Sequence, residues 1–355
     1  MPWTVEGVLP CRRQAALEDD LNALDSVAAA PAVAARVGEH LRDLAARGVG
    51  GRVMSRLVSA FNDRLAIRVV ELTARRHRLP AVAWCWLAFG SEGRHEQTFI
   101  SDQDNGLVFS ATDRREAAAL RELFLPFAQD VNRRLADCGF ALCPGEIMAG
   151  NPAWCLSLEE WRWQFVEWVR RPDPQALLNA SIFFDLRPLY GDADLGEQLR
   201  TLLLSQTADT PAFLHLMAAN ALQAAAPLNF RGEVVADDAE ANSVDLKKFG
   251  SRIFVDAARI MALGSGARSV NTSARLHDAG PAAGMQPDEI AAVDAAFSQI
   301  LRLRLAHQLA AVPGSAETGH GVPLDSLNEV DRAILKESLR QAKRLQHRLK
   351  LNYGL

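Results

Sequence analysis

Two aspartates separated by a single residue, Asp102 and Asp104, have the type and spacing that suit metal chemistry. Alternate residues of a strand project from the same face, so both carboxylates would point to one spot at the start of a strand. Mg²⁺ takes hard oxygen ligands, usually one or two carboxylates together with substrate phosphates and water. The spacing therefore predicts a metal-nucleotide site, although a polar turn between two strands would contain the same residue types.

A glycine-serine pair precedes these acids and suits phosphate. The apolar residues 82–89 end at Gly90 and Ser91, and a second apolar run follows the acids at residues 106–109. If the two runs are neighbouring strands, the pair forms a tight turn into a helix beside the acids. The N–H groups and the positive dipole end of such a turn favour phosphate, and Ser91 adds a hydroxyl.

Two charged residues flank the turn on its other side. The Arg94 guanidinium suits a phosphate, and the Glu96 carboxylate suits either Arg94 or a metal-bound water. We therefore expect Gly90, Ser91, Arg94 and Glu96 to take part in nucleotide binding.

The run GSEGRHEQTFISDQDN, residues 90–105, resembles the nucleotidyltransferase superfamily, in which a Gly-Ser or Gly-Gly turn is followed by a strand with Asp-x-Asp. It is most similar to nucleotidyltransferases related to the N-terminal domain of PII-protein uridylyltransferase, many of which also carry CBS domains. The resemblance implies metal ligation by Asp102 and Asp104. It also implies a third catalytic carboxylate on a later strand, for which Glu146 is the candidate by its order in the chain.

The same resemblance extends to later segments. Asp185 and Arg187 lie in an Asp-x-Arg-x-x-x-Gly-Asp pattern typical of these relatives, where they would brace the metal site or contact triphosphate. An ion pair within or between helices would explain them equally well. The segment VDLKKFGSRIFVDAARIMALGSGARSVNTSARL resembles the substrate-binding domain that accompanies the family. Lys247 and Arg252 are its candidate nucleotide ligands, and the alternative for Lys247 is a role at a helix start.

Composition sets broad limits on the class of protein. The 355 residues are 49% hydrophobic and 23% charged, as in globular proteins, and the net charge of −4 does not favour nucleic acid as a partner. No apolar run approaches the roughly 18–20 residues that span a bilayer. The N-terminus lacks a secretion-signal pattern. We therefore expect a cytoplasmic protein, without membrane association, whose five cysteines are reduced thiols.

Hydrophobic periodicity predicts mostly helices around a small sheet. Helices are expected at residues 52–77, 114–137, 174–189 and 325–351, and residues 140–148 are a candidate third strand. Trp161, Phe165 and Trp168 have helical spacing, which favours core packing over stacking on adenine. The basic face of the last helix is interpreted as solvated rather than as a nucleic-acid contact.

These observations predict an α+β protein with a small mixed-sheet nucleotidyltransferase domain between helical parts. The expected domains are an N-terminal helical segment at residues 1–80, the nucleotidyltransferase-like domain at 81–205, and a helical, substrate-binding domain at 206–355.

The predicted function is Mg²⁺-dependent (or Mn²⁺-dependent) transfer of a nucleoside monophosphate from an NTP, ATP or UTP, to a protein or small-molecule acceptor. The resemblance makes the activity uridylyltransferase-like, and a homodimer is a candidate assembly. The alternative is a nucleotide-binding regulatory protein without catalysis. Gln103 and Asn105 stand where uridylyltransferases have apolar residues, which bears on the choice of uridylylation more than on the metal site.

Overall fold

The computed structural model describes residues 12–238, 242–310 and 321–355. The chain divides into two compact units. Unit 1 comprises Met1–Arg47, Val53–Arg171 and Leu178–Leu203, and unit 2 comprises Gly48–Arg52, Pro172–Leu177 and Leu204–Leu355. The fold is mostly helical α+β with one four-stranded mixed sheet, which confirms the predicted class.

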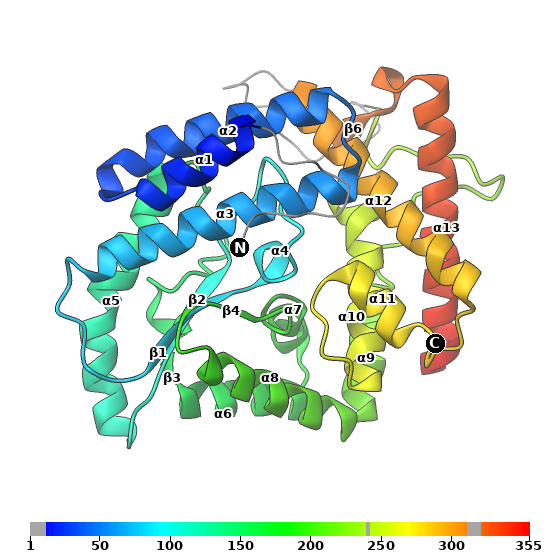
Figure 1. Cartoon of the computed structure of the whole chain (residues 1–355). Helices are drawn as coiled ribbons and strands as arrows, with labels where there is room; N and C mark the ends of the chain where they lie inside the picture. Colours follow the sequence, from blue (N-terminus) through cyan, green and yellow to red (C-terminus); the bar gives the residue numbers. More distant parts are fainter. Residues whose placement is uncertain (1–11, 239–241, 311–320) are drawn as a thin grey trace. The chain divides into compact units, whose positions relative to one another are not determined.

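The helices and strands follow one another along the chain as labelled in Figure 1. The first half contains α1 (Arg12–Ala23), α2 (Ala30–Ala46), α3 (Gly51–Ala74), β1 (Trp84–Ala88), α4 (Gly90–Gly93), β2 (Asn105–Phe109), α5 (Arg114–Asp137), β3 (Cys155–Ser157) and α6 (Leu158–Arg170). The second half contains α7 (Pro174–Phe183), β4 (Arg187–Gly191), α8 (Ala193–Ala208), α9 (Pro211–Ala221), β5 (Ser243–Asp245), a π-helix (Lys247–Ser251), α10 (Arg252–Ser265), α11 (Thr272–Ala279), α12 (Pro287–Ala310), β6 (Gly321–Pro323) and α13 (Glu329–Tyr353).

The sheet of unit 1 has the strand order β3-β2-β1-β4. The two apolar runs form neighbouring strands, β1 and β2, which pair antiparallel with Ala88 opposite Asn105. Strand β4 pairs antiparallel with the other edge of β1, and β3 pairs parallel with β2. The end of β1, which the Gly-Ser pair follows, therefore lies beside the start of β2, which the two aspartates precede.

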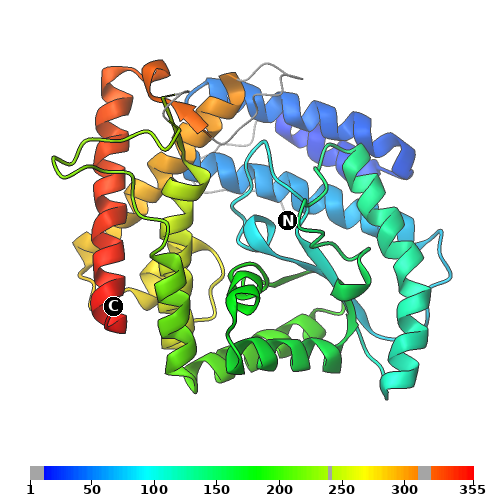
Figure 2. The same cartoon turned by 180° about the vertical axis from the view of Figure 1, so that it is seen from behind.

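Helices cover both faces of this sheet (Figures 1 and 2). On one face, Phe124 and Phe127 of α5 pack against the Trp84 ring of β1, with ring centroids 6.1 and 5.4 Å away. On the other face, Phe89 packs against Trp161 of α6 at 5.8 Å and against Phe183 of α7 at 4.7 Å. Burial of these aromatic rings fixes the sheet between the helices.

One predicted strand is wrong, one predicted helix begins as expected at Pro174 but ends early, and one helical stripe is confirmed. Residues 140–148 form no strand but a turn-rich segment with one isolated bridge, Asp102 with Ala141, and the third strand is β3. The helix expected at 174–189 ends at Phe183, and Arg187 begins β4. The aromatic stripe of α6 is buried, as the core interpretation required, and consists of Trp161, Phe165 and Trp168.

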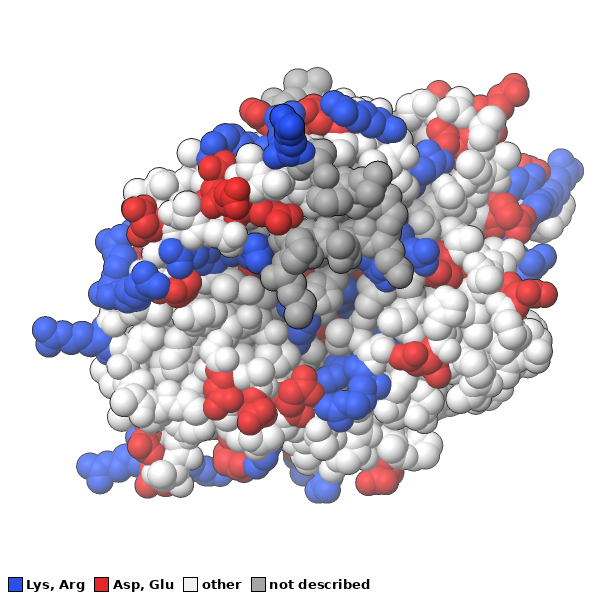
Figure 3. Space-filling model, in the orientation of Figure 1, with Lys and Arg blue, Asp and Glu red and all other residues white. Residues whose placement is uncertain are grey.

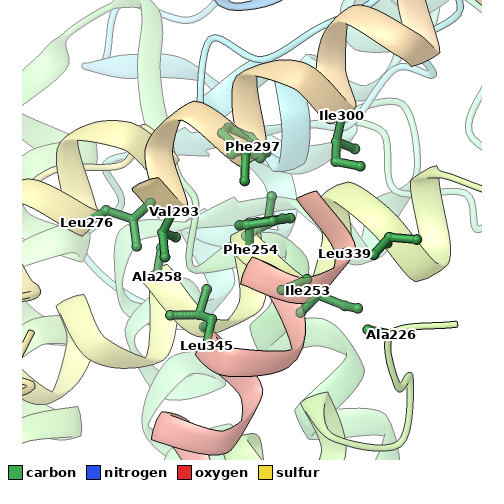
Figure 4. Packing of buried hydrophobic residues seen from close by; sticks show 14 of the residues in the cluster. Ala226, Ile253, Phe254, Ala258, Leu276, Val293, Phe297, Ile300, Leu339 and Leu345 are labelled. Atoms are coloured by element: carbon green, nitrogen blue, oxygen red, sulfur yellow. The ribbon is translucent and has the colours of Figure 1, made fainter. Parts of the chain in front are cut away.

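Unit 2 has a helical core of its own. Figure 4 shows side chains of α10, α11, α12 and α13 converging, and the rings of Phe254 and Phe297 lie 5.7 Å apart within it. Helix α10 is followed by Gly266, whose φ of 72° is the left-handed conformation that commonly ends a helix.

Acidic and basic side chains are interspersed over the face seen in Figure 3. Within the described residues, no helix is both long enough and apolar enough to cross a membrane. The described cysteines, Cys85, Cys138, Cys143 and Cys155, are all free thiols, and Cys11 lies outside the described residues.

Candidate functional site

The turn after β1 and the acidic segment before β2 are in direct contact. The Phe89 amide donates to the backbone oxygen of Asp104 at 2.8 Å. A Cβ added at Gly90, which has a φ of 51°, would lie 2.6 Å from Asp104 Oδ2. The Asp104 carboxylate therefore rests against Gly90, and a side chain at this position would have to displace it.

Burial alternates along the acidic segment. Gln103 and Asn105 are buried and bind the same side chain, because Asn132 Nδ2 donates to Gln103 Oε1 at 2.9 Å and to Asn105 Oδ1 at 3.0 Å. Asp102 and Asp104 are only partly buried. This alternation is the pattern expected if the two carboxylates project from the side opposite α5.

The backbone of the turn offers hydrogen-bond donors. Gly93 and Arg94 donate their amides to Phe89 O and Gly90 O, at 2.8 and 3.1 Å. Among the described residues, no acceptor binds the amides of Gly90, Ser91 or Glu92. Such first-turn N–H groups suit the oxygens of a phosphate.

Arg94 is held by two carboxylates within the protein. Its Nε donates to Glu96 Oε2 at 2.7 Å and its Nη1 donates to Asp185 Oδ2 at 2.5 Å. The side chains of Arg94, Glu96 and Asp185 are 12%, 4% and 0% exposed. An added Cβ at Gly93 would lie only 2.0 Å from the Asp185 backbone oxygen. The three charges therefore brace the turn, and Arg94 is less available to phosphate than the sequence indicates.

Arg187 ties the same turn to α3. Its Nη2 donates to both carboxylate oxygens of Asp63, at 2.8 and 2.9 Å, and to Glu92 O at 3.1 Å. Arg187 does this from strand β4, and its partner Asp63 comes from a helix. It therefore positions the turn rather than forming the intrahelical pair that the sequence left open.

Sequence reasoning missed Glu92, which is 7% exposed at the centre of this cluster. Burial raises its pKa to about 8, and the carboxylates of Asp63 and Asp104 add to the rise while Arg187 opposes it. A carboxyl that is largely protonated near neutral pH beside a candidate metal ligand is a feature typical of functional sites. Its place in the tight Gly-Ser-Glu-Gly turn is the only signal in the sequence.

Glu146 lies on a turn, not on a strand. It is exposed and has a φ of 54°. Its segment nevertheless runs beside the acids, because the Asn105 amide donates to Ile147 O at 3.1 Å. Burial and the Asp104 carboxylate raise the pKa of the nearby Cys143 thiol to about 11. In the part of the chain that is described, no three His, Cys, Asp or Glu side chains form a group ready to hold a metal.

Lys247 and Arg252 belong to unit 2. The Asp245 carboxylate accepts the backbone amides of Lys247 and Lys248, at 2.8 and 2.9 Å, as the helix-start interpretation implies. Arg252 Nε lies 3.2 Å from Asp256 Oδ2, and its side chain is 42% exposed. A role for either residue in nucleotide binding stays a prediction.

Comparison with protein families matches both halves of the chain. The family described as "Putative nucleotidyltransferase DUF294" covers residues 35–175, which contain the turn and the acidic segment. The family described as "Putative nucleotidyltransferase substrate binding domain" covers residues 211–353. None of the curated proteins matches the chain. The chain therefore contains both domains that these descriptions name, the "Putative nucleotidyltransferase DUF294" domain and the "Putative nucleotidyltransferase substrate binding domain".

Proposed function

We propose that the protein is a Mg²⁺-dependent nucleotidyltransferase that moves a nucleoside monophosphate from an NTP to an acceptor. The contact between Asp104 Oδ2 and Gly90 carries this proposal, because it puts a carboxylate beside a turn with unused amide donors. Family membership supplies the class of reaction.

The residues of the site fit a divalent cation. Asp102 and Asp104 offer hard carboxylate oxygens that solvent reaches in part, as Mg²⁺ or Mn²⁺ requires. When bound, the metal would lower the charge on the phosphates and favour attack by an acceptor oxygen. Asp102 and Asp104 are the residues that would hold it.

The remaining groups position the NTP. In the proposed reaction an acceptor oxygen bonds to the α-phosphorus and pyrophosphate leaves. The Gly90, Ser91 and Glu92 amides would bind phosphate oxygens, and the Ser91 hydroxyl would add one donor. Arg94, Glu96, Asp185 and Arg187 keep the turn rigid, so these donors need little reorganisation during reaction.

The nucleotide donor and the acceptor are proposed only as classes. The donor is ATP or UTP, and the acceptor is a protein or a small molecule. The side chains of Gln103 and Asn105 bind Asn132 and do not face the site. Their polar character is therefore satisfied by Asn132, and it does not determine which nucleobase the NTP carries. Glu146 remains the proposed third carboxylate, and bound nucleotide would have to draw its turn toward Asp104.

A nucleotide-binding protein without turnover is the second candidate. It is favoured by one observation: the described residues contain no group of three His, Cys, Asp or Glu side chains that could hold a metal ion. This candidate shares the metal and the phosphate contacts, and differs only in the absence of pyrophosphate release.

The test uses each of the four NTPs labelled at the α-phosphate, with Mg²⁺ and candidate acceptors. We expect label transfer and pyrophosphate release by the wild type and at least about a hundredfold less by Asp102→Asn/Asp104→Asn. Glu122→Gln is the matched control, because Glu122 is exposed on α5 and has no ion pair among the described residues. Equal transfer by the double variant would exclude the proposed site. Mg-NTP binding without transfer would select the second candidate.

A further inference from the structure

A cavity of about 350 Å³ opens in unit 1, away from the Gly90 turn. Its walls are α2, α3, the last residue of α5 and two connecting segments, residues 98–101 and 138–140. Small-molecule sites begin at roughly 300 Å³, so this cavity suits a small ligand rather than a nucleotide or a peptide.

The floor of the cavity is apolar. Val37 and Leu41 of α2 and Val58, Phe61 and Leu65 of α3 line it, and each is at most 5% exposed. An apolar ligand group placed there would lose part of its contact with water, which favours binding by roughly 25 cal/mol for each Å² removed from water.

Two opposite charges stand on different walls. Arg42 belongs to α2, and Asp137 ends α5. Neither side chain has an ion-pair partner within the described ranges. The Arg42 guanidinium folds over Gly38, which also lines the cavity, since an added Cβ there would lie 3.5 Å from Arg42 Nη1.

We propose that this cavity binds a free α-amino acid with an apolar side chain. The zwitterion offers a carboxylate to Arg42 and an ammonium group to Asp137, while its side chain covers the apolar floor. A nucleotide fits poorly, because several negative charges would meet one arginine and one aspartate.

The cavity walls continue into the acidic segment. Ser101 lines the cavity and directly precedes Asp102. Phe140, also in the wall, accepts a hydrogen bond through its backbone oxygen from Gln103 Nε2 at 3.1 Å. A bound amino acid would therefore contact residues that are joined directly to the acidic segment. Binding itself does not depend on nucleotidyl transfer.

The experiment is calorimetric titration of the full chain, without NTP, by L-leucine and by L-phenylalanine. Two leucine analogues, each without one charged group, serve as probes. 4-Methylpentanoate lacks the ammonium group, and 3-methylbutylamine lacks the carboxylate. We expect at least one amino acid to bind, and each analogue to bind about tenfold to a hundredfold more weakly than leucine, because it loses one charged contact.

Variants identify the cavity as the site. Arg42→Gln and Asp137→Asn should each weaken binding about tenfold or more, and Ala34→Phe should abolish it by filling the cavity from α2. Glu39→Gln, on the exposed side of α2, should bind as the wild type does. The inference is overturned if neither amino acid binds at millimolar concentration, or if Arg42→Gln, Asp137→Asn and Ala34→Phe leave the affinity unchanged. NTP turnover is measured separately, so its failure would leave this result intact.

Discussion

In the candidate site, a glycine lies directly against a carboxylate. Gly90 has no Cβ, and Asp104 Oδ2 occupies the space that one would need. The position of the Asp104 carboxylate depends on the missing Cβ of Gly90. The Gly-Ser pair and the second aspartate therefore form one structural unit. Both residues could be singled out from the sequence because each is a local signal with a known conformational or chemical preference.

We predict that Gly90→Ala lowers the free energy of Mg-NTP binding by more than it lowers the free energy of unfolding. The positive φ alone costs about 1 kcal/mol, and the new Cβ must also displace the Asp104 carboxylate. Gly139→Ala is the control, because Gly139 has a φ of 96° and nothing within 4 Å of an added Cβ. Urea unfolding and the Mg-NTP-induced rise in Tm measure the two effects. Equal losses of ligand response in both variants would contradict the assigned contact.

Glu92 predicts a pH dependence of stability. Its pKa is about 8 in the folded protein, against a usual value of 4.5, so the native state holds a proton that the unfolded chain releases. The stability from this protonation is fully present below about pH 4.5 and is lost as the pH rises toward 8. Glu92→Gln cannot titrate, and should remove this slope.

Urea unfolding in EDTA at several pH values between about 5 and 8 measures that slope. We expect Glu92→Gln to be more stable than the wild type at the upper end, with the difference shrinking as the pH falls. Glu122→Gln should keep the wild-type profile. Parallel profiles for the wild type and Glu92→Gln would show that this carboxyl does not hold its proton.

The sequence does not predict which charged side chains of the site form ion pairs with one another. Asp63 and Arg187 are far apart in the chain, and only the fold makes them a pair. Arg94 was expected to face phosphate, yet Glu96 and Asp185 already bind its guanidinium. Residue type predicts which groups are able to bind an anion, but not which one the protein has already paired.

At the scale of elements, the start of β2 is fixed by an amide network with α5. Asn132 binds Gln103 and Asn105, and its Oδ1 accepts the Gly150 amide at 2.8 Å. This network sets the direction of the acidic segment. Because it holds Gln103 and Asn105 toward α5, the side chains of Asp102 and Asp104 project toward the opposite face. It also explains two polar residues that the sequence pattern marked as unusual.

We predict that Asn132→Ala destabilises the protein by about 1–3 kcal/mol, since several buried polar groups lose their partner. Loss of the network should also reduce the response of Tm to Mg-NTP. Gln129→Ala is the control on the same helix, because its single bond to Gly150 O is long, at 3.3 Å, and exposed. A change of less than about 0.5 kcal/mol in Asn132→Ala would show that the network does not hold the segment.

Helices were predicted better than strands for a physical reason. Helix α5 has a long apolar stripe and an aspartate cap, and its bounds match the expectation of residues 114–137. Strand β3 has three residues, too few for any alternation to be seen. The helix predicted through residue 189 ignored Pro188, whose ring disfavours a helical conformation at Arg187, and the chain forms β4 there instead.

At the scale of the whole molecule, the family match covers both the sheet region and the helical region that follows. The division of labour that this implies, nucleotide chemistry in one and substrate binding in the other, could be anticipated from local motifs. A role for Lys247 and Arg252 stays a prediction, because periodicity places a residue on its own helix but not against a distant ligand.

The proposal that Asp102 and Asp104 hold a divalent cation against the Gly90 turn is tested most directly by Mn²⁺ titration, with free Mn²⁺ counted by electron paramagnetic resonance in the presence of a non-hydrolysable NTP analogue. We expect one or two Mn²⁺ ions bound per chain in the wild type and in Glu122→Gln, and an affinity at least about tenfold lower in Asp102→Asn and in Asp104→Asn. Unchanged Mn²⁺ affinity in both aspartate variants would contradict the account.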